Sequence, residues 1–199
     1  MSVRPLERVA SVLDNVVYHG GSVELRPVDF EVQGTWDGGL LQEGEFARLQ
    51  LELEAASSCL TIKVEAAFFD DPKPAGGPGS QKGLWNFEVV ELFLLGDGEQ
   101  YLEIELGPYG HYLGLRLNGR RNVIKDGIQF EYSAQRSARQ WSGIAHLSLD
   151  WLPSPIRAAN VYAIHGVGRA RRYLAANPVP GKFPDFHRLK YFEPLSLGD

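Results

Sequence analysis

Apolar and polar residues alternate along much of the chain with a period of two. The alternation is clearest at 49–53, 60–64, 102–106 and 113–117. Successive side chains of a β-strand point to opposite faces of its sheet, so this pattern predicts strands with one buried and one exposed face. Further runs of strand character predict additional strands at 23–32, 129–134, 140–149, 161–167 and 189–192.

Turn-forming residues separate the predicted strands. Asn118-Gly119 directly follows one of them and predicts a hairpin, because both residues tolerate the positive φ angles of a tight turn. Glycine-rich or glycine-proline turns at 96–98 and 107–108 bound the neighbouring runs. About ten short strands with turns between them predict an all-β chain folded as an antiparallel β-sandwich, with a barrel as the alternative.

Length and local composition bear on the domain organisation. A β-sandwich of roughly 200 residues is common as one unit, so residues 1–199 are predicted to form a single domain, with 1–20 as a candidate N-terminal extension. Apolar residues at 6, 9 and 13 share one helical face and predict a short helix over 5–13. The stretch 70–83 is rich in glycine and proline, and we interpret it as a loop rather than an interdomain linker.

The charge balance excludes several classes of partner. The chain has 25 acidic and 20 basic residues, a net charge of −5, and no long basic block. Clustered Lys and Arg side chains dominate phosphate binding, so no nucleic-acid partner is expected. No apolar run approaches the ~20 residues that span a bilayer, and residues 1–10 lack the apolar core of a signal peptide. A single cysteine, Cys59, forms no intrachain disulfide, and these features together favour a cytoplasmic protein without a membrane partner.

Motifs for cofactors and metals are incomplete. The segment 76–83 has glycine where a phosphate-binding loop needs Ser or Thr after its lysine, and 166–171 ends in arginine where a dinucleotide fingerprint needs a small residue. The five histidines form no ligand pair on one element. No cofactor is therefore expected. The metal question stays open, because Asp70 and Asp71 are candidate calcium ligands, although two adjacent loop carboxylates are more often only solvated.

Two pairs of glutamates are candidates for acid–base chemistry. Glu88 and Glu91 lie close in sequence, as do Glu103 and Glu105. A glycosidase needs two carboxyl groups flanking one bond. Because Glu103 and Glu105 share one face of a predicted strand, we interpret them as an exposed acidic stripe in preference to a catalytic pair.

The most informative block runs from Trp85 to Leu94 and continues through 101–108. Its tryptophan precedes an acidic strand of the form W-x-x-[DE]-x-[VI]-E-[LIV]-[FY]. Together with 171–178 and 183–192, this block resembles family 9 carbohydrate-binding modules and their wider, DOMON-like sandwich relatives. More closely, the whole chain resembles an uncharacterised family of cytoplasmic proteins with the same sandwich and no established activity.

The resemblance implies a sugar site in which two aromatic rings enclose a pyranose and polar groups meet its hydroxyls. Carried over to this chain, Trp85 is one ring, Tyr173 the second ring, and Glu91 a hydroxyl acceptor. Arg116 is the candidate basic contact. The chain departs from the family at two positions, since Tyr173 stands in place of a tryptophan and His187 in place of a glycine.

Three functions follow from these features. The first is binding of a saccharide or similar small molecule in an aromatic-lined cleft. The second is a small intracellular enzyme that acts on a sugar-like substrate, with a carboxylate and either His165 or His187 as acid–base groups. The third is a scaffold for protein interaction, because a fold alone does not specify a function. A purely structural interpretation also stands, in which Trp85 caps the core and a buried Glu91 is paired with Arg116 or His187.

Overall fold

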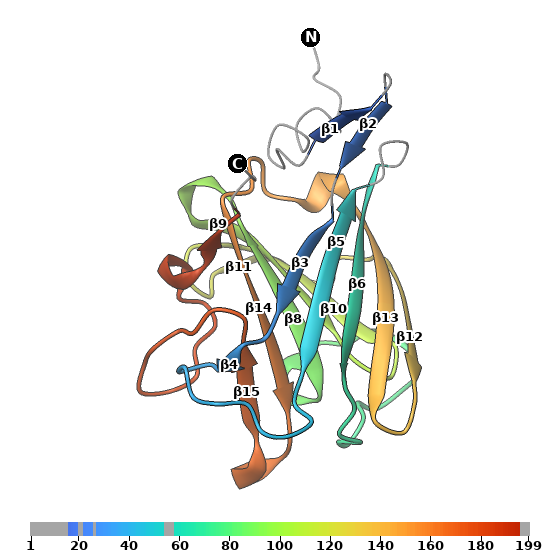
Figure 1. The fold of residues 1–199 in the computed structure, drawn as a ribbon, viewed down its shortest axis with the longest axis vertical. Coiled ribbons are helices and arrows are strands. Elements are labelled where there is room, and N and C mark those ends of the chain that lie inside the picture. Colours follow the sequence, from blue (N-terminus) through green and yellow to red (C-terminus); the bar gives the residue numbers. More distant parts are fainter. Residues whose placement is uncertain (1–15, 20–21, 26, 54–57, 196–199) are drawn as a thin grey trace.

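Two β-sheets lie face to face and make up most of the chain (Figure 1). The structure is a computed structural model that describes residues 16–19, 22–25, 27–53 and 58–195. The larger sheet has nine strands and the smaller five, and all their pairings are antiparallel except one short parallel pair. The predicted antiparallel β-sandwich is therefore confirmed. No α-helix occurs in the described ranges, and the helix predicted over 5–13 lies outside them.

The larger sheet contains the central strands of the fold. Its members are β4 (Gly34–Thr35), β7 (Gly79–Ser80), β8 (Val89–Leu95), β9 (Gln100–Leu106), β10 (His111–Asn118), β11 (Val123–Lys125), β14 (Ala158–His165), β15 (Arg172–Ala175) and β16 (Glu193–Pro194). Their order is β11–β10–β9–β8–β14–β15–β4, with β7 beside β10 and β16 beside β14. The strands β8, β9 and β14 therefore lie in the middle of the sheet, where both of their edges are paired.

The smaller sheet covers one face of the larger one. Its strands are β3 (Val28–Glu31), β5 (Ala47–Leu53), β6 (Cys59–Ala67), β12 (Glu131–Arg136) and β13 (Gln140–Ser148), in the order β12–β13–β6–β5–β3. A separate hairpin is formed by β1 (Val16–His19) and β2 (Ser22–Leu25). Short 3-10 helices connect strands at η1 (Leu84–Asn86), η2 (Asp97–Glu99), η3 (Leu149–Trp151), η4 (Gly168–Ala170) and η5 (Leu189–Tyr191).

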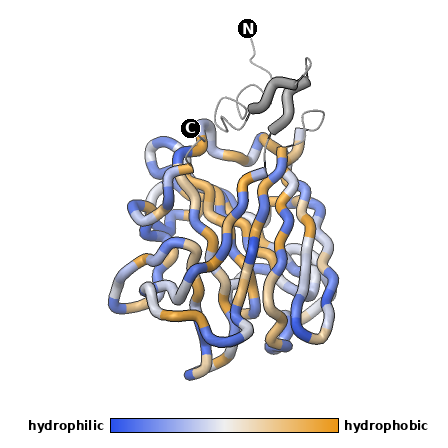
Figure 2. The backbone as a smooth tube through the Cα atoms, in the orientation of Figure 1, coloured by the Kyte–Doolittle hydropathy of each residue, from blue (hydrophilic) through white to orange (hydrophobic). Residues whose placement is uncertain are grey.

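The main core lies between the two sheets. Alternate aliphatic residues of β5 and β6 pack against alternate residues of β8 and β9, including Leu49, Ile62, Leu92 and Ile104. Hydrophobic and hydrophilic positions alternate along β5 of the smaller sheet (Figure 2). Each such side chain contributes roughly 1.5–3 kcal/mol when it is fully buried, so this interface is the main source of stability.

The central strands are buried on both faces, which differs from the prediction. The predicted alternation of buried and exposed positions is confirmed in β5 and β13. Nearly every residue of β8, β9 and β10 is buried instead. A second hydrophobic cluster explains the difference, because Val179, Phe186 and Phe192 from the segment after β15 pack on the outer face of the larger sheet.

Two local predictions have different outcomes. The hairpin predicted at Asn118-Gly119 joins β10 to β11, and Gly119 has a φ of 82°. The strand predicted at 189–192 is wrong, since this stretch forms η5 before β16. There the N–H groups of residues 191 and 192 donate to carbonyls three residues earlier, and these local bonds replace ladder bonds.

Candidate ligand-binding pocket

A pocket of about 420 Å³ lies on the outer face of the larger sheet. This volume falls within the range of small-molecule sites. Its polar and aromatic lining includes Trp85, Glu91, Glu103, Arg121, Tyr173 and His187. These residues come from β8, β9, β15, the short helix η1, the turn after β10 and the segment before η5. Residues far apart in the sequence are thus brought to one place by the order of the strands.

Four of the five residues implied by the family resemblance line this pocket: Trp85, Glu91, Tyr173 and His187. Arg116 does not line it, and its Nη2 atom donates a hydrogen bond to Gln100 Oε1 at 3.3 Å. The period of two along β10 explains its position. Leu115 and Leu117 contribute to the pocket, so the side chain between them points to the other face of the strand.

Arg171 connects the two aromatic residues of the pocket. Its guanidinium donates hydrogen bonds to the carbonyl oxygens of Trp85, Asn86 and Gly166. The same group lies 5.6 Å from the centre of the Tyr173 ring, within the range of a cation–π contact. Arg171 therefore holds the short helix η1 against the β14–β15 connection and fixes the spacing of the two rings.

A second arginine joins the β10–β11 turn to the C-terminal segment. Arg121 Nη2 lies 3.1 Å from Asp185 Oδ1, and Arg120 pairs with the same carboxylate. The backbone N–H of Arg121 also donates to the Tyr101 hydroxyl at 3.1 Å. Burial alone would raise the pKa of Asp185, but the two arginines lower it, so the carboxylate stays charged. Arg121 has a φ of 59°, a conformation that costs a non-glycine residue about 1–2 kcal/mol.

Three buried glutamates cluster on β8 and β9, and two of them, Glu91 and Glu103, line the pocket. Glu91 of β8 stands directly opposite Glu105 of β9, and Glu103 shares the face of Glu105 two residues earlier. Their exposed fractions are 2%, 0% and 3%, so the exposed acidic stripe predicted for Glu103 and Glu105 is wrong. The covering segment after β15 accounts for the difference. One oxygen of Glu91, one of Glu103 and both of Glu105 have no hydrogen-bond partner among the described residues.

Burial shifts the protonation of this glutamate cluster. Desolvation, followed by the nearby charge of Glu103, raises the pKa of Glu91 well above its usual range. Desolvation and the charges of Glu91 and Glu103 do the same to the pKa of Glu105. Burial raises the pKa of Glu103 to about 7. Like charges on adjacent carboxyls disfavour joint ionisation, so at neutral pH the cluster retains protons.

His187 is neutral in this setting. Its Nδ1 atom lies 2.8 Å from the Tyr101 hydroxyl and 3.9 Å from Glu103 Oε2. Burial, followed by the charge of Arg121, lowers the pKa of His187 to about 4. The ring therefore supplies a polar neutral group beside Glu103, and it does not neutralise that carboxyl.

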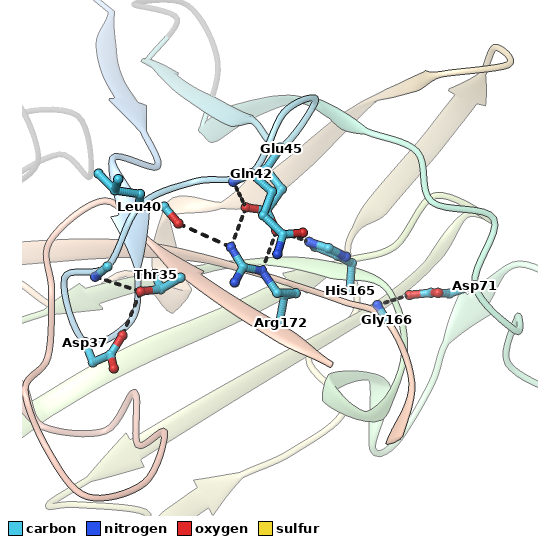
Figure 3. A network of polar contacts seen from close by, with 10 residues as sticks. Thr35, Asp37, Leu40, Gln42, Glu45, Asp71, His165, Gly166 and Arg172 are labelled. Carbon is cyan, nitrogen blue, oxygen red and sulfur yellow. Dashed lines mark hydrogen bonds and ion pairs between the residues drawn. The ribbon is translucent and has the colours of Figure 1, made fainter. Parts of the chain in front are cut away.

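The other predicted acid–base residues lie elsewhere. Glu88 accepts hydrogen bonds from the backbone N–H groups of Phe69 and Asp71 at 3.2 and 3.4 Å. His165 Nε2 lies 2.9 Å from Glu45 Oε1, and this pair belongs to a separate polar network (Figure 3). Neither Glu88 nor His165 lines the pocket.

Glu45 is the centre of that second network (Figure 3). Its carboxylate accepts from Arg172 Nε at 2.6 Å, Arg172 Nη2 at 2.8 Å and the Gln42 backbone N–H at 2.6 Å. Burial alone would raise the pKa of Glu45, but these bonds and the contact with His165 lower it to about 2. The network ties the loop before β5 to the ends of β14 and β15.

Metal coordination gains no support from the described part of the chain. No group of three or more His, Cys, Asp or Glu residues in it is arranged to hold a metal ion. The candidate calcium ligands have protein partners instead: Asp70 accepts from the Tyr109 hydroxyl at 3.2 Å, and Asp71 from the backbone N–H of Gly166.

Among the described residues there is also no helix of the length and apolar character needed to cross a membrane.

The fold and the pocket define a class: an antiparallel β-sandwich with a polar, aromatic-lined site on the outer face of its larger sheet. A solved structure of a candidate carbohydrate-binding protein from Bacteroides uniformis is similar, with a TM-score of 0.63 over 84% of both chains and 12% identity. That likeness shows the fold alone. A family 9 carbohydrate-binding module from Caldicellulosiruptor kristjanssonii, solved with cellotriose, has a TM-score of 0.47 over 79% of this chain and 74% of that chain, at 13% identity.

Sequence relatives identify the family. The chain is 41% identical over 179 residues to the UPF0462 protein C4orf33 homolog of Rattus norvegicus, covering 85% of this chain and 88% of that protein. It is 40% identical over 180 residues to the UPF0462 protein C4orf33 of Homo sapiens, with the same coverage. The chain belongs to this UPF0462 family. No protein-family model matches it.

Proposed function

We propose that the chain binds a saccharide or a similar small polyol in the pocket lined by Trp85, Tyr173 and Glu91. One observation carries the proposal: two aromatic side chains line the same cavity as Glu91 and Glu103, each of which has one carboxyl oxygen without a partner in the described part of the chain. Trp85 is 43% exposed, so its ring is accessible to a ligand at the pocket. The similar fold of the candidate carbohydrate-binding protein supports the same conclusion.

The chemistry of the lining suits a pyranose. Aromatic faces cover the apolar C–H groups of a sugar ring, and carboxyl oxygens accept hydrogen bonds from its hydroxyls. A buried polar atom left without a partner costs about 1–3 kcal/mol. A ligand that supplies hydroxyl donors to Glu91 and Glu103 removes this cost, whereas an apolar ligand of the same shape does not.

Replacement of Trp85 tests the proposal. Trp85→Ala is expected to weaken saccharide binding at least tenfold with little loss of stability, because much of this side chain is exposed. Isothermal titration with D-glucose and a panel of mono- and short oligosaccharides at millimolar concentration measures the change. Ile144→Ala is the matched control, since Ile144 is 44% exposed and belongs to β13 of the other sheet.

Two results would contradict this assignment. The first is the absence of binding heat with every sugar of the panel in the unmodified chain. The second is equal sugar affinity in the Trp85→Ala and Ile144→Ala variants, which would locate any binding outside the pocket.

Acid–base catalysis on a sugar-like substrate is the second candidate. The raised pKa of Glu103, about 7, favours it, because a general acid needs a proton near neutral pH. The arrangement fits binding better, since Glu91, Glu103 and Glu105 all rise from one face of one sheet, whereas a glycosidase places its two carboxyls on either side of the bond. Release of glucose from cellotriose, abolished by Glu103→Gln, would support catalysis; an unchanged substrate after prolonged incubation would exclude this reaction.

A further inference from the structure

We propose that the ligand of this pocket is an amino sugar or a related amine-bearing polyol, whose ammonium group lies against Glu91 and Glu103. This inference rests on the proposed saccharide site and adds the charge of its ligand. The starting observation is that Glu91 and Glu103 line the cavity although they are only 2% and 3% exposed, and that each has one buried oxygen without a hydrogen-bond partner among the described residues.

Two arginines line the pocket in the described part of the chain, Arg121 and Arg171, and neither forms an ion pair with Glu91 or Glu103. The guanidinium of Arg171 is bound to three backbone carbonyls on the pocket wall. Arg121 is paired with Asp185 at 3.1 Å, and its side chain is 60% exposed. The imidazole of His187 is neutral, because burial lowers its pKa to about 4. A cationic ligand can therefore supply the partner with which one of these carboxyls ionises.

The spacing of the carboxyls favours an organic cation over a metal ion. Residues directly opposite on antiparallel strands, such as Glu91 and Glu105, have Cβ atoms about 5 Å apart, and residues two apart on one strand, such as Glu103 and Glu105, lie about 7 Å apart. A calcium ion needs six or more oxygens at about 2.3–2.6 Å. The described residues contain no such arrangement.

An ammonium group binds buried carboxyls such as Glu91 and Glu103 more strongly than a hydroxyl does. It offers three N–H donors and a full charge, and a charge-assisted hydrogen bond is roughly twice as strong as a neutral one. The half-exposed ring of Trp85 adds a surface that also attracts cations.

The inference predicts proton release on binding. Several charged or titratable groups surround Glu91 and Glu103 from neighbouring elements: Glu105, Arg171, Tyr162, Tyr101, Arg121, Asp185 and His187. Of Glu91, Glu103 and Glu105, Glu103 ionises most readily at neutral pH, because its pKa is about 7 and the pKa values of the other two are raised well above their usual range. An ammonium that contacts it favours the ionised form, so amine affinity rises with pH by up to tenfold per unit, the limit for one released proton.

Matched sugars test the inference. D-glucosamine, D-glucose and N-acetyl-D-glucosamine have closely similar rings, and only the first is charged. Titration calorimetry between pH 5.5 and 7.0, in two buffers of different ionisation enthalpy, gives affinity and proton count together. We expect D-glucosamine to bind at least tenfold more tightly than either neutral sugar at pH 7.0, with net proton release and with affinity that increases with pH. The affinity of the neutral sugars is expected to stay nearly constant.

Variants separate the carboxyl effect from changes in folding. Glu91→Gln and Glu103→Gln keep the side-chain size and remove the ability to ionise, and each is expected to cancel most of the preference for D-glucosamine. Glu65→Gln, on the exposed side of β6 in the other sheet, is expected to leave the preference unchanged. Circular dichroism spectra confirm that each variant is folded before its binding is compared.

The outcomes distinguish this inference from the proposed function. Neutral sugars that bind as tightly as D-glucosamine would overturn the amine inference and leave saccharide binding intact. Binding of D-glucosamine without proton release, or with its preference unaffected by both Gln variants, would overturn it as well. An absence of binding by all three sugars would overturn the inference together with the proposed saccharide site.

Discussion

At the scale of single residues, arginines hold the pocket together and glutamates give it its chemistry. Arg171 binds the backbone of η1 and lies over the Tyr173 ring, while Arg121 and Arg120 share the carboxylate of Asp185. These contacts join segments that are distant in sequence. The pocket is therefore sensitive to residues that need not touch a ligand.

Glu45 offers a stability test at the same scale. Glu45→Ala leaves Arg172 and His165 without their shared carboxylate, and breaking a buried ion pair in this way costs about 3 kcal/mol. Glu31→Ala is the control, because the Glu31–Arg48 pair is largely exposed and such pairs contribute less than about 1 kcal/mol. Urea denaturation at pH 7 measures both free energies of unfolding. Equal losses in the two variants would contradict the role assigned to Glu45.

The Glu45 effect also has a defined pH dependence. Its pKa in the folded chain, about 2, lies below its ordinary value of 4.5, so its stabilising effect is complete above pH 4.5 and disappears as the pH falls toward 2. The difference between the parent chain and Glu45→Ala is expected to shrink across that window. A difference that stays constant down to pH 2 would show that the carboxylate is not held in its charged form.

At the scale of elements, Glu103 of β9 makes stability depend on pH in the opposite direction to Glu45, because its pKa is raised in the folded chain. The folded chain raises the pKa of Glu103 from 4.5 to about 7, so its ionisation opposes folding increasingly as the pH rises between these values. Glu103→Gln is expected to match the parent chain near pH 4.5 and to be more stable by about 1–3 kcal/mol at pH 8. Urea denaturation across this range provides the measurement, with Glu65→Gln as the exposed control. A variant that is less stable at pH 8 would contradict the burial described for Glu103.

The alternating pattern identified the strands but not the second covering of the larger sheet. Leu49, Leu51 and Leu53 of β5 follow the predicted alternation, since only one face of that strand is covered. Glu103 and Glu105 follow the same alternation in sequence, yet both are buried. Their cover comes from residues more than seventy positions later, such as Phe186, and a local pattern holds no information about such a contact.

The local sequence pattern likewise predicts only some of the residues that line the pocket. The motif around Trp85 and Glu91 indicated which strand carries the pocket, and the resemblance brought in Tyr173 and His187. The resemblance places the basic contact at Arg116, whose side chain the period of β10 turns away from the cavity. Arg121 lies in the turn beyond that strand and takes a left-handed conformation, which no nearby residue signals.

At the scale of the whole molecule, the sandwich has two hydrophobic layers with different roles. The layer between the sheets is largely aliphatic, and it contains more of the buried hydrophobic residues. The layer outside the larger sheet contains aromatic rings beside buried carboxyls, and it is interrupted by the pocket. A binding site built on the rigid central strands β8 and β9 is pre-organised, so the ligand does not need to order the backbone beneath it.

The indole N–H signal of Trp85 gives the most direct test of saccharide binding in this pocket. The chain has four tryptophans, of which Trp85 is 43% exposed at the pocket and Trp141 is 1% exposed in the main core. In a ¹H–¹⁵N NMR titration with D-glucose and D-glucosamine, the Trp85 signal, assigned with Trp85→Phe, is predicted to shift saturably while the Trp141 signal stays in place. An unchanged Trp85 signal at millimolar sugar, or saturable shifts confined to the other tryptophans, would contradict the account.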